Sequence, residues 1–151
     1  MRLLPTVLAL SLITAAYAAE PVSPQRARGL ETLETITGGG TAALRESLQD
    51  IAPELGDWIV DFAYGDVVSR PALDLRTREL ATVAALTALG NAQPQLKSHI
   101  KGALNAGCTP REVVEVILQM SVYAGFPAAL NGVAAAREVF TERGIVLEPA
   151  P

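Results

Sequence analysis

The residue best suited to chemistry in this chain is its single histidine, His99. Histidine is the side chain that ordinarily exchanges protons near neutral pH. At helical spacing Leu96, Ile100 and Ala103 share a face with His99, so the imidazole points toward an apolar side. A polar ring there is unfavourable unless a partner holds it or a reaction uses it. His99 is therefore either an acid and base or a structural residue that bonds a backbone carbonyl at a subunit contact.

The single cysteine, Cys108, lies between Gly107 and the start of a predicted helix. One thiol excludes an internal disulfide framework and a Cys-x-x-Cys redox pair. At a helix start a thiolate gains from the helix dipole. The alternative is a small apolar residue that fills a loop, and the lack of an adjacent base in the sequence favours it.

Residues 1–18 are predicted to be a secretory signal peptide. Arg2 gives a positive n-region, Leu3 to Ala15 an apolar h-region, and Ala16-Tyr17-Ala18 a small-residue cleavage site. We therefore expect an exported protein, periplasmic or secreted, whose mature chain begins near Ala19. The apolar run is too short for a good membrane span, although an uncleaved anchor is the alternative.

The chain that remains, residues 19–151, is acidic and long enough for one domain with its own core. Without Arg2 the 12 basic residues become 11, which against 16 acidic residues gives a net charge of −5. An acidic chain without a basic cluster is a poor nucleic-acid binder. Aromatic residues make up only 5% of the sequence. Helices rich in alanine bury little area each, so we expect subunit association to bury more.

Every strong secondary-structure signal is helical. Asp74 can cap a helix that ends at Leu89, and Thr109 begins a capping box with Glu112. A loop is expected from Gly65 to Pro71. The expected helices cover about residues 24–35, 41–51, 53–63, 75–89, 94–106, 110–124 and 127–143.

No alternating apolar and polar run is long enough for a strand, so the predicted fold is all-α. Its centre is an antiparallel hairpin of Leu75–Leu89 against Gln95–Ala106.

Several stretches in a fixed order resemble the carboxymuconolactone decarboxylase family. They are Tyr64 to Leu80, the His99 helix with Asn105 to Glu112, and Tyr123 to Asn131. The resemblance extends over about residues 29–140. It implies a small all-α subunit that assembles as a homotrimer or homohexamer, with sites near subunit contacts.

The same superfamily contains alkylhydroperoxidase D-type proteins, whose site is Cys-x-x-Cys-x-x-x-His. Counting back from His99 places those two thiols at Gln95 and Ala92, which have no redox chemistry. This argues against a dithiol peroxidase.

The resemblance implies decarboxylation of a lactone whose ring accepts the electrons, so that no metal or organic cofactor is required. The protein must then hold carboxylates, stabilise an oxyanion and deliver a proton to carbon. His99 fits the proton donor. Tyr64 and Tyr123 can donate hydrogen bonds, although Tyr123 also fits core packing. The cations that can clamp carboxylates are Arg70, Arg76 and Arg78, whose alternative is an ordinary solvated helix start.

Glu79 matches the position where related proteins carry an acidic partner of the histidine. A simple hairpin folded about Ala92 places Glu79 opposite Asn105, six residues or roughly 9 Å along the axis from His99. Direct contact would then need a strong crossing angle, a bridging water or a neighbouring subunit. The alternative for Glu79 is an acidic residue favoured near a helix N-terminus.

The sequence thus predicts a cofactor-free lyase or isomerase that acts on a small anionic lactone or related carboxylate, with His99 as proton carrier. One alternative is a redox protein that uses the single thiol of Cys108. Another is a non-catalytic exported oligomer that binds a small acid or a partner protein.

Overall fold

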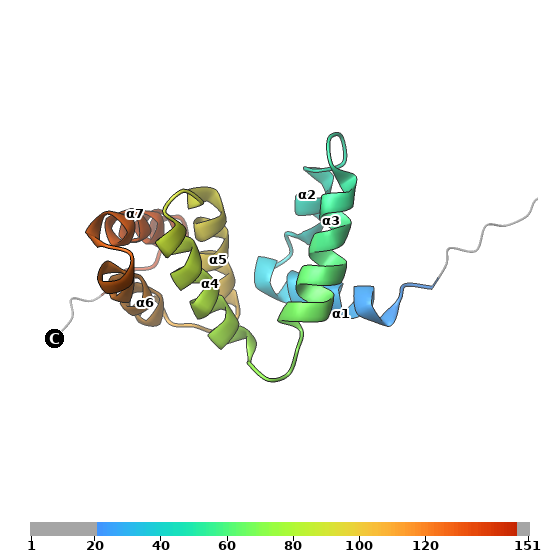
Figure 1. The fold of residues 1–151 in the computed structure, drawn as a ribbon, viewed down its shortest axis with the longest axis horizontal. Coiled ribbons are helices and arrows are strands. Elements are labelled where there is room, and N and C mark those ends of the chain that lie inside the picture. The colour runs from blue at the N-terminus through green and yellow to red at the C-terminus, as the bar shows by residue number, and fades with distance from the viewer. Residues whose placement is uncertain (1–20, 148–151) are drawn as a thin grey trace, which may run out of the picture.

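The computed structural model describes residues 21–147, and all their regular structure is helical (Figure 1). The all-α prediction is confirmed, since these residues contain no strand. The predicted signal segment lies outside the described residues. Within residues 21–147 no helix is both long and apolar enough to cross a membrane. The elements are α1 (Pro24–Thr37), α2 (Thr41–Glu46), α3 (Pro53–Trp58), the π-helix η1 (Ile59–Val68), α4 (Leu75–Leu89), α5 (Gln93–Asn105), α6 (Pro110–Tyr123) and α7 (Phe126–Glu142).

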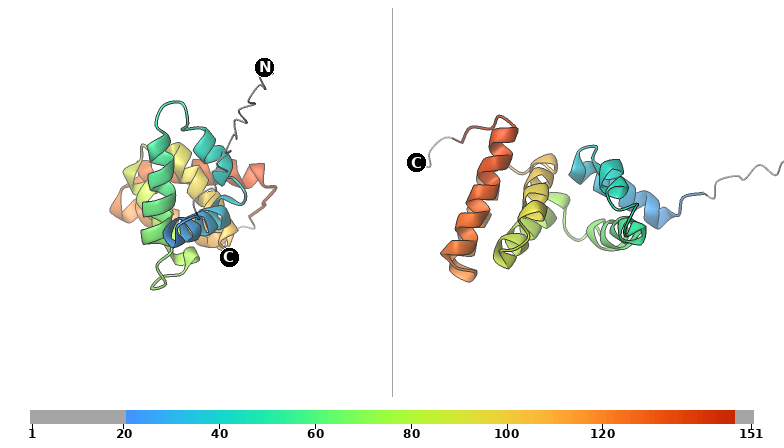
Figure 2. Two further views of the ribbon diagram at one scale, coloured as in Figure 1. Left: turned by 90° about the vertical axis from the view of Figure 1, so that its right-hand side faces the viewer. Right: turned by 90° about the horizontal axis from the view of Figure 1, so that it is seen from above.

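The helices stack in three layers, which the view from above in Figure 2 separates. The N-terminal layer contains α1, α2, α3 and η1, the middle layer is the pair α4 and α5, and α6 and α7 form the last layer. Helix α1 packs on α5, while α6 and α7 pack on the other side of the middle pair. The middle pair is the predicted central hairpin, so the helices that carry Glu79 and His99 lie between the two outer layers.

The main core lies between the middle and last layers. Its residues are aliphatic or small except for Phe140, in keeping with the scarcity of aromatic residues in the sequence. Close helix packing is possible because alanines stand at several of the contacts. The fully or nearly fully buried members are Val83, Leu96, Ile100, Ala103, Cys108, Val113, Ile117, Ala135, Ala136, Val139 and Phe140.

The predicted helix starts are confirmed where a side chain caps the helix. The Oδ1 atom of Asp74 accepts the backbone N–H of Thr77 at 2.7 Å, which begins α4. In the capping box, Thr109 Oγ1 accepts the N–H of Glu112 at 3.2 Å and Glu112 Oε2 accepts the N–H of Thr109 at 2.7 Å. These bonds satisfy backbone donors that a helix leaves free in its first turn.

Two expected boundaries are wrong. Helix α2 ends at Glu46, because the chain continues through 3₁₀-type turns in which Leu48 and Gln49 donate to carbonyls three residues back. The expected loop from Gly65 is helical through Val68, as part of η1.

The contact between α1 and η1 explains why glycine lies inside a helix here. A Cβ atom on Gly29 would lie 2.0 Å from the carbonyl oxygen of Val60, and one on Gly65 would lie 2.8 Å from the carbonyl oxygen of Gln25. The two backbones touch at these glycines. Gly65 is therefore required by packing, whereas the sequence pattern suggested that it breaks the helix.

Candidate active site

Glu79 and His99 form a direct contact between α4 and α5. The Oε2 atom of Glu79 lies 2.9 Å from Nδ1 of His99. The Glu79 side chain is 2% exposed, whereas that of His99 is 26% exposed. A buried carboxylate is costly unless it is paired, and here the imidazole is its partner.

This contact corrects the expectation from the simple hairpin. No second subunit or bridging water is needed, because the two atoms are within hydrogen-bond distance in one chain. The separation of roughly 9 Å expected from the hairpin lies along the helix axes and does not include the reach of the side chains. Both side chains are long, and they meet between the helices. The imidazole is also held by a carboxylate, which differs from the backbone-carbonyl alternative for His99.

His99 lines a cavity of about 460 Å³ between the N-terminal layer and α5. The wall surface is mainly apolar, although half of the lining residues carry a polar group, and the walls come from α1, α2, η1 and α5. The lining residues are Leu33, Ile36, Thr37, Gly40, Leu44, Ile59, Ala63, Tyr64, Gln95, Ser98, His99 and Lys101. Most of a small organic acid could be enclosed in such a space.

Tyr64 shares this cavity with His99 and comes from the π-helix η1. Burial raises the pKa of Tyr64 to about 12, and the negative charge of Glu79 acts in the same direction. The phenol therefore keeps its proton at neutral pH. It is a hydrogen-bond donor in a mainly apolar wall, as the sequence suggested for this residue.

Among residues 21–147, Lys101 is the one lysine or arginine that lines the cavity. Its Nζ atom also contacts Glu142, with the nearest carboxylate oxygen at 2.7 Å. Both side chains of this pair are more than a third exposed. Exposed ion pairs contribute little stability, so the ammonium can exchange this partner for the carboxylate of a bound molecule at small cost.

The three arginines proposed as carboxylate clamps lie outside this cavity. Arg76 donates from Nη2 to both carboxylate oxygens of Glu112, at 2.7 and 2.8 Å. Arg78 donates to the backbone carbonyls of Arg70 and Leu73 and so ties down the loop before α4. Arg70 lines a different, open hollow at that loop. Their positions within this chain fit the structural alternative better.

Tyr123 and Cys108 also lie apart from His99. Tyr123, at the end of α6, is 76% exposed, so the core-packing alternative does not hold within one chain. Cys108 is 5% exposed, and its Sγ donates to the carbonyl of Arg76 at 3.6 Å. Burial raises the pKa of the Cys108 thiol, which outweighs the nearby guanidinium of Arg76. The residue is a core member, as the alternative interpretation had it.

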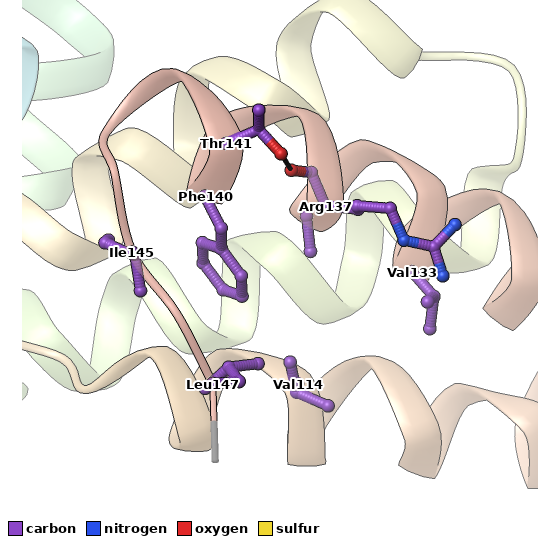
Figure 3. Close-up of a pocket in the computed structure, with 8 residues that line it drawn as sticks. Val114, Val133, Arg137, Phe140, Thr141, Ile145 and Leu147 are labelled. Atoms are coloured by element: carbon purple, nitrogen blue, oxygen red, sulfur yellow. Dashed lines mark hydrogen bonds between the residues drawn. The ribbon is translucent and has the colours of Figure 1, made fainter. Parts of the chain in front are cut away.

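A second cavity, of about 290 Å³, lies between α6, α7 and the segment after α7 (Figure 3). Its walls are mostly apolar and include Phe140, Ile145 and Leu147. The polar contact drawn in Figure 3 is the hydroxyl of Thr141, which donates to the carbonyl of Arg137 at 2.8 Å. No group there exchanges protons near neutral pH, so the His99 cavity is the better candidate for chemistry.

Several residues of the cavity are not among the candidates expected from the sequence. Gln95 precedes His99 by one helical turn, so helical periodicity alone would have placed it beside the imidazole. Ser98 and Lys101 are one and two residues from His99 on α5, so helical spacing alone does not predict that they line the same cavity. Thr37 comes from α1, which packs across α5, and no local pattern indicates that contact.

Comparison with known proteins identifies the family of this chain. The model of the carboxymuconolactone decarboxylase family matches residues 53–138, a span that includes Tyr64, Glu79 and His99. The chain is also 42% identical, over 103 residues, to 4-carboxymuconolactone decarboxylase of Acinetobacter baylyi, covering 68% of this chain and 76% of the relative. The chain belongs to the carboxymuconolactone decarboxylase family.

The chain is also similar to two further proteins. An uncharacterised 15.0 kDa protein of Paracoccus denitrificans is 35% identical over 97 residues, which covers 64% of this chain and 72% of that protein. The nitrosuccinic acid decarboxylase of Metarhizium robertsii is 36% identical over 73 residues, which covers 48% of this chain and 50% of that protein. Two of these three relatives are named as decarboxylases, of different acids.

Proposed function

We propose that this chain is a cofactor-free carboxy-lyase that acts on a small anionic lactone or a related carboxylate, with His99 as proton carrier. The observation that carries the proposal is the arrangement of one histidine. Its Nδ1 is held by a buried carboxylate, and its ring lines a cavity with mainly apolar walls that is large enough for a small acid. Decarboxylase-named relatives from this family support the same reaction class.

The chemistry of an unsaturated lactone explains why few groups suffice. When the bond to the carboxylate breaks, carbon dioxide leaves and the electron pair moves through the ring double bond onto the lactone carbonyl oxygen. The resulting enolate then takes a proton on carbon, which restores a neutral ring. The ring supplies the electron sink, so the protein must bind the acid, stabilise the oxyanion and deliver one proton.

In this proposal three residues of the cavity region have distinct tasks. His99 acts as the imidazolium, with hydrogen on both nitrogens, and delivers the hydrogen on Nε2, because Nδ1 is engaged by Glu79. The neutral ring with hydrogen on Nδ1 remains after the transfer. Glu79 is a positioning residue that favours the tautomer with hydrogen on Nδ1 and fixes the ring plane. Tyr64 donates its phenolic hydrogen to the developing oxyanion, which its raised pKa permits over the whole physiological range.

The assembly and location of the protein are part of the proposal. We propose a homotrimer or homohexamer that is exported to the periplasm or the medium, where its substrate is a small anionic molecule. The exposed apolar side chains at the end of α6 and the start of α7 support association, and the sequence of residues 1–18 supports export.

Redox chemistry through a single thiol is disfavoured by the position of Cys108. The thiol is buried in the main core, burial raises its pKa, and Cys108 does not line the His99 cavity. Reactive cysteines are usually partly exposed thiolates in electropositive surroundings.

The test is a direct assay of the purified protein. 4-Carboxymuconolactone and nitrosuccinic acid are each incubated with the enzyme, with no enzyme and with the Glu79→Gln variant, and carbon dioxide release is measured. We expect enzyme-dependent release from at least one acid and a clear loss of kcat in the variant. An organic hydroperoxide with a thiol reductant is the parallel assay. Hydroperoxide turnover without decarboxylation would overturn the proposal in favour of Cys108, and inactivity with tight binding of either acid would favour a binding protein.

A further inference from the structure

We propose that Gly102 is a positioning residue, because the absence of its side chain makes the space through which the carboxylate of Glu79 reaches His99. The inference concerns how the acid and base pair is built. Its catalytic consequence rests on the proposed function, whereas its structural consequence does not.

The geometry at Gly102 is tight on two sides. A Cβ atom on this residue would lie 2.6 Å from Oε2 of Glu79 and 3.3 Å from its Cδ. The same Cβ would lie 2.7 Å from Cγ2 of Ile36 in α1. Contacts below 3.0 Å between such atoms are not tolerated, so one of the neighbours would have to move.

The oxygen that a Cβ would displace is the one that contacts His99. Oε2 of Glu79 lies 2.9 Å from Nδ1 of the ring, and Gly102 follows His99 by about one turn of α5. Gly102 also lies midway in sequence between His99 and Asn105, the residue that a simple hairpin places opposite Glu79. A bare backbone at this point lets the Glu79 side chain bridge the offset between the two helices.

The carboxylate has no easy alternative position. Glu79 is 2% exposed and Gly102 is buried as well, so an expelled carboxylate would lose its partner without gaining water. Ile36 closes the other side and lines the His99 cavity, so its displacement would change the cavity wall. Three helices, α1, α4 and α5, therefore meet at a residue where a Cβ atom would crowd the pair, so we expect it to displace the Glu79 carboxylate from its position beside His99.

The first test compares Gly102→Ala with a matched control, Gly132→Ala, in the full-length protein. Gly132 is buried in α7, and a Cβ there would lie 2.7 Å from Cγ2 of Ile117 and 2.9 Å from Cγ2 of Thr87. The two substitutions thus cause similar crowding, but only the first crowds Glu79. Alanine is a better helix former than glycine, so any loss comes from these contacts.

The expected result is a split between activity and stability. Both variants should lower the thermal midpoint, whereas only Gly102→Ala should lower kcat, by at least about 10-fold, with a smaller change in KM. In a Glu79→Ala background, Gly102→Ala should cause no further loss of kcat, because the group through which it acts is gone. An equal loss of kcat in both glycine variants would overturn the inference.

A second variant separates the two crowded neighbours. Ile36→Leu removes the Cγ2 methyl, so the double variant Gly102→Ala with Ile36→Leu relieves that contact and keeps the one with Glu79. We expect it to fold better than Gly102→Ala while kcat stays low. Recovery of kcat in this double variant would assign the effect to the cavity wall and refute the role in placing Glu79.

A readout that needs no substrate is the ring of the one histidine. In untagged, ¹⁵N-labelled protein, His99 gives the only imidazole signals, and their ¹⁵N shifts report which nitrogen carries hydrogen. Wild type and Gly132→Ala should show hydrogen on Nδ1, and Gly102→Ala should show the mixture of tautomers found in Glu79→Ala. An unchanged signal in Gly102→Ala contradicts the inference. If the signal changes in a protein that has no decarboxylase activity, the inference about Gly102 stands and only the proposed function is refuted.

Discussion

Glu79 and His99 are 20 positions apart in sequence, yet Oε2 of one lies 2.9 Å from Nδ1 of the other across the α4 and α5 pair. The carboxylate is buried and the ring lines a cavity, so the contact connects the interior of the fold to the space available to a ligand. With Nδ1 held in this way, Nε2 is the nitrogen left to exchange a proton with a bound molecule.

His99→Gln should lower kcat on the true substrate by at least about 10²-fold, because general acid and base catalysis contributes about 10² to 10⁴-fold. Glutamine keeps a polar side chain of similar reach but cannot carry the proton. Oligomeric state and thermal midpoint should change little. His99→Leu should also abolish turnover while the protein still assembles. Activity close to wild type in the glutamine variant would establish a structural role for the ring.

Lys101→Met should raise KM for an anionic substrate by about 10-fold or more and change kcat less, because a charge-assisted hydrogen bond to the carboxylate is lost. The matched control is Lys97→Met. Lys97 lies on the same helix and pairs with Glu138 at 2.5 Å, as Lys101 pairs with Glu142, but it does not line the cavity. Equal KM changes in the two variants would show a general effect of charge.

Tyr64→Phe should lower kcat by about 10²-fold, the usual effect of removing one oxyanion donor. It should also change alkaline stability. The phenol has a pKa of about 12 when folded against 10.0 unfolded, so its contribution is present below pH 10 and is lost as the pH rises toward 12. Urea unfolding at several pH values should therefore show that the free energy of unfolding falls less steeply at alkaline pH in Tyr64→Phe than in wild type.

Cys108→Ala and Cys108→Ser should both retain decarboxylase activity, because the reaction needs no thiol. Serine should be the less stable variant by about 1 kcal/mol or more, since it buries a hydroxyl in the main core. From the sequence alone, which places Cys108 in a loop, the expected loss of stability in Cys108→Ser is smaller. In wild type, a thiol reagent at pH 8 should react slowly with the folded protein and rapidly in denaturant. Fast reaction of the folded protein, with loss of turnover in both variants, would support the thiol hypothesis.

The purified protein should be a trimer or a multiple of one by light scattering. The apolar face formed by the end of α6 and the start of α7 is the proposed contact, and it leaves large side chains exposed in the single chain. These are Leu118, Val122, Tyr123, Phe126 and Leu130. Val122→Glu should reduce the assembly, whereas Val146→Glu, at an isolated exposed valine, should not. An unchanged assembly in Val122→Glu would place the subunit contact elsewhere, and a wild-type monomer would remove the assembly proposal.

The sequence by itself determined the helical class, most helix boundaries and the residue that can carry a proton. Those features depend on local chemistry: Asp74 and Thr109 cap helices through their own side chains, and periodic apolar residues place His99 on an inward face. It also made Glu79 a candidate partner through resemblance to a family.

Only the tertiary structure decided which of the candidates meet. The Glu79 contact depends on how α4, α5 and α1 pack at Gly102, and the place of Lys101 in the cavity depends on the N-terminal layer that covers α5. The arginines Arg76 and Arg78 are taken up by Glu112 and by loop carbonyls, which lie beside them only after folding. Spacing along one helix predicts a face, whereas a contact between helices depends on side-chain volumes at the crossing, where a single missing Cβ decides whether two groups touch.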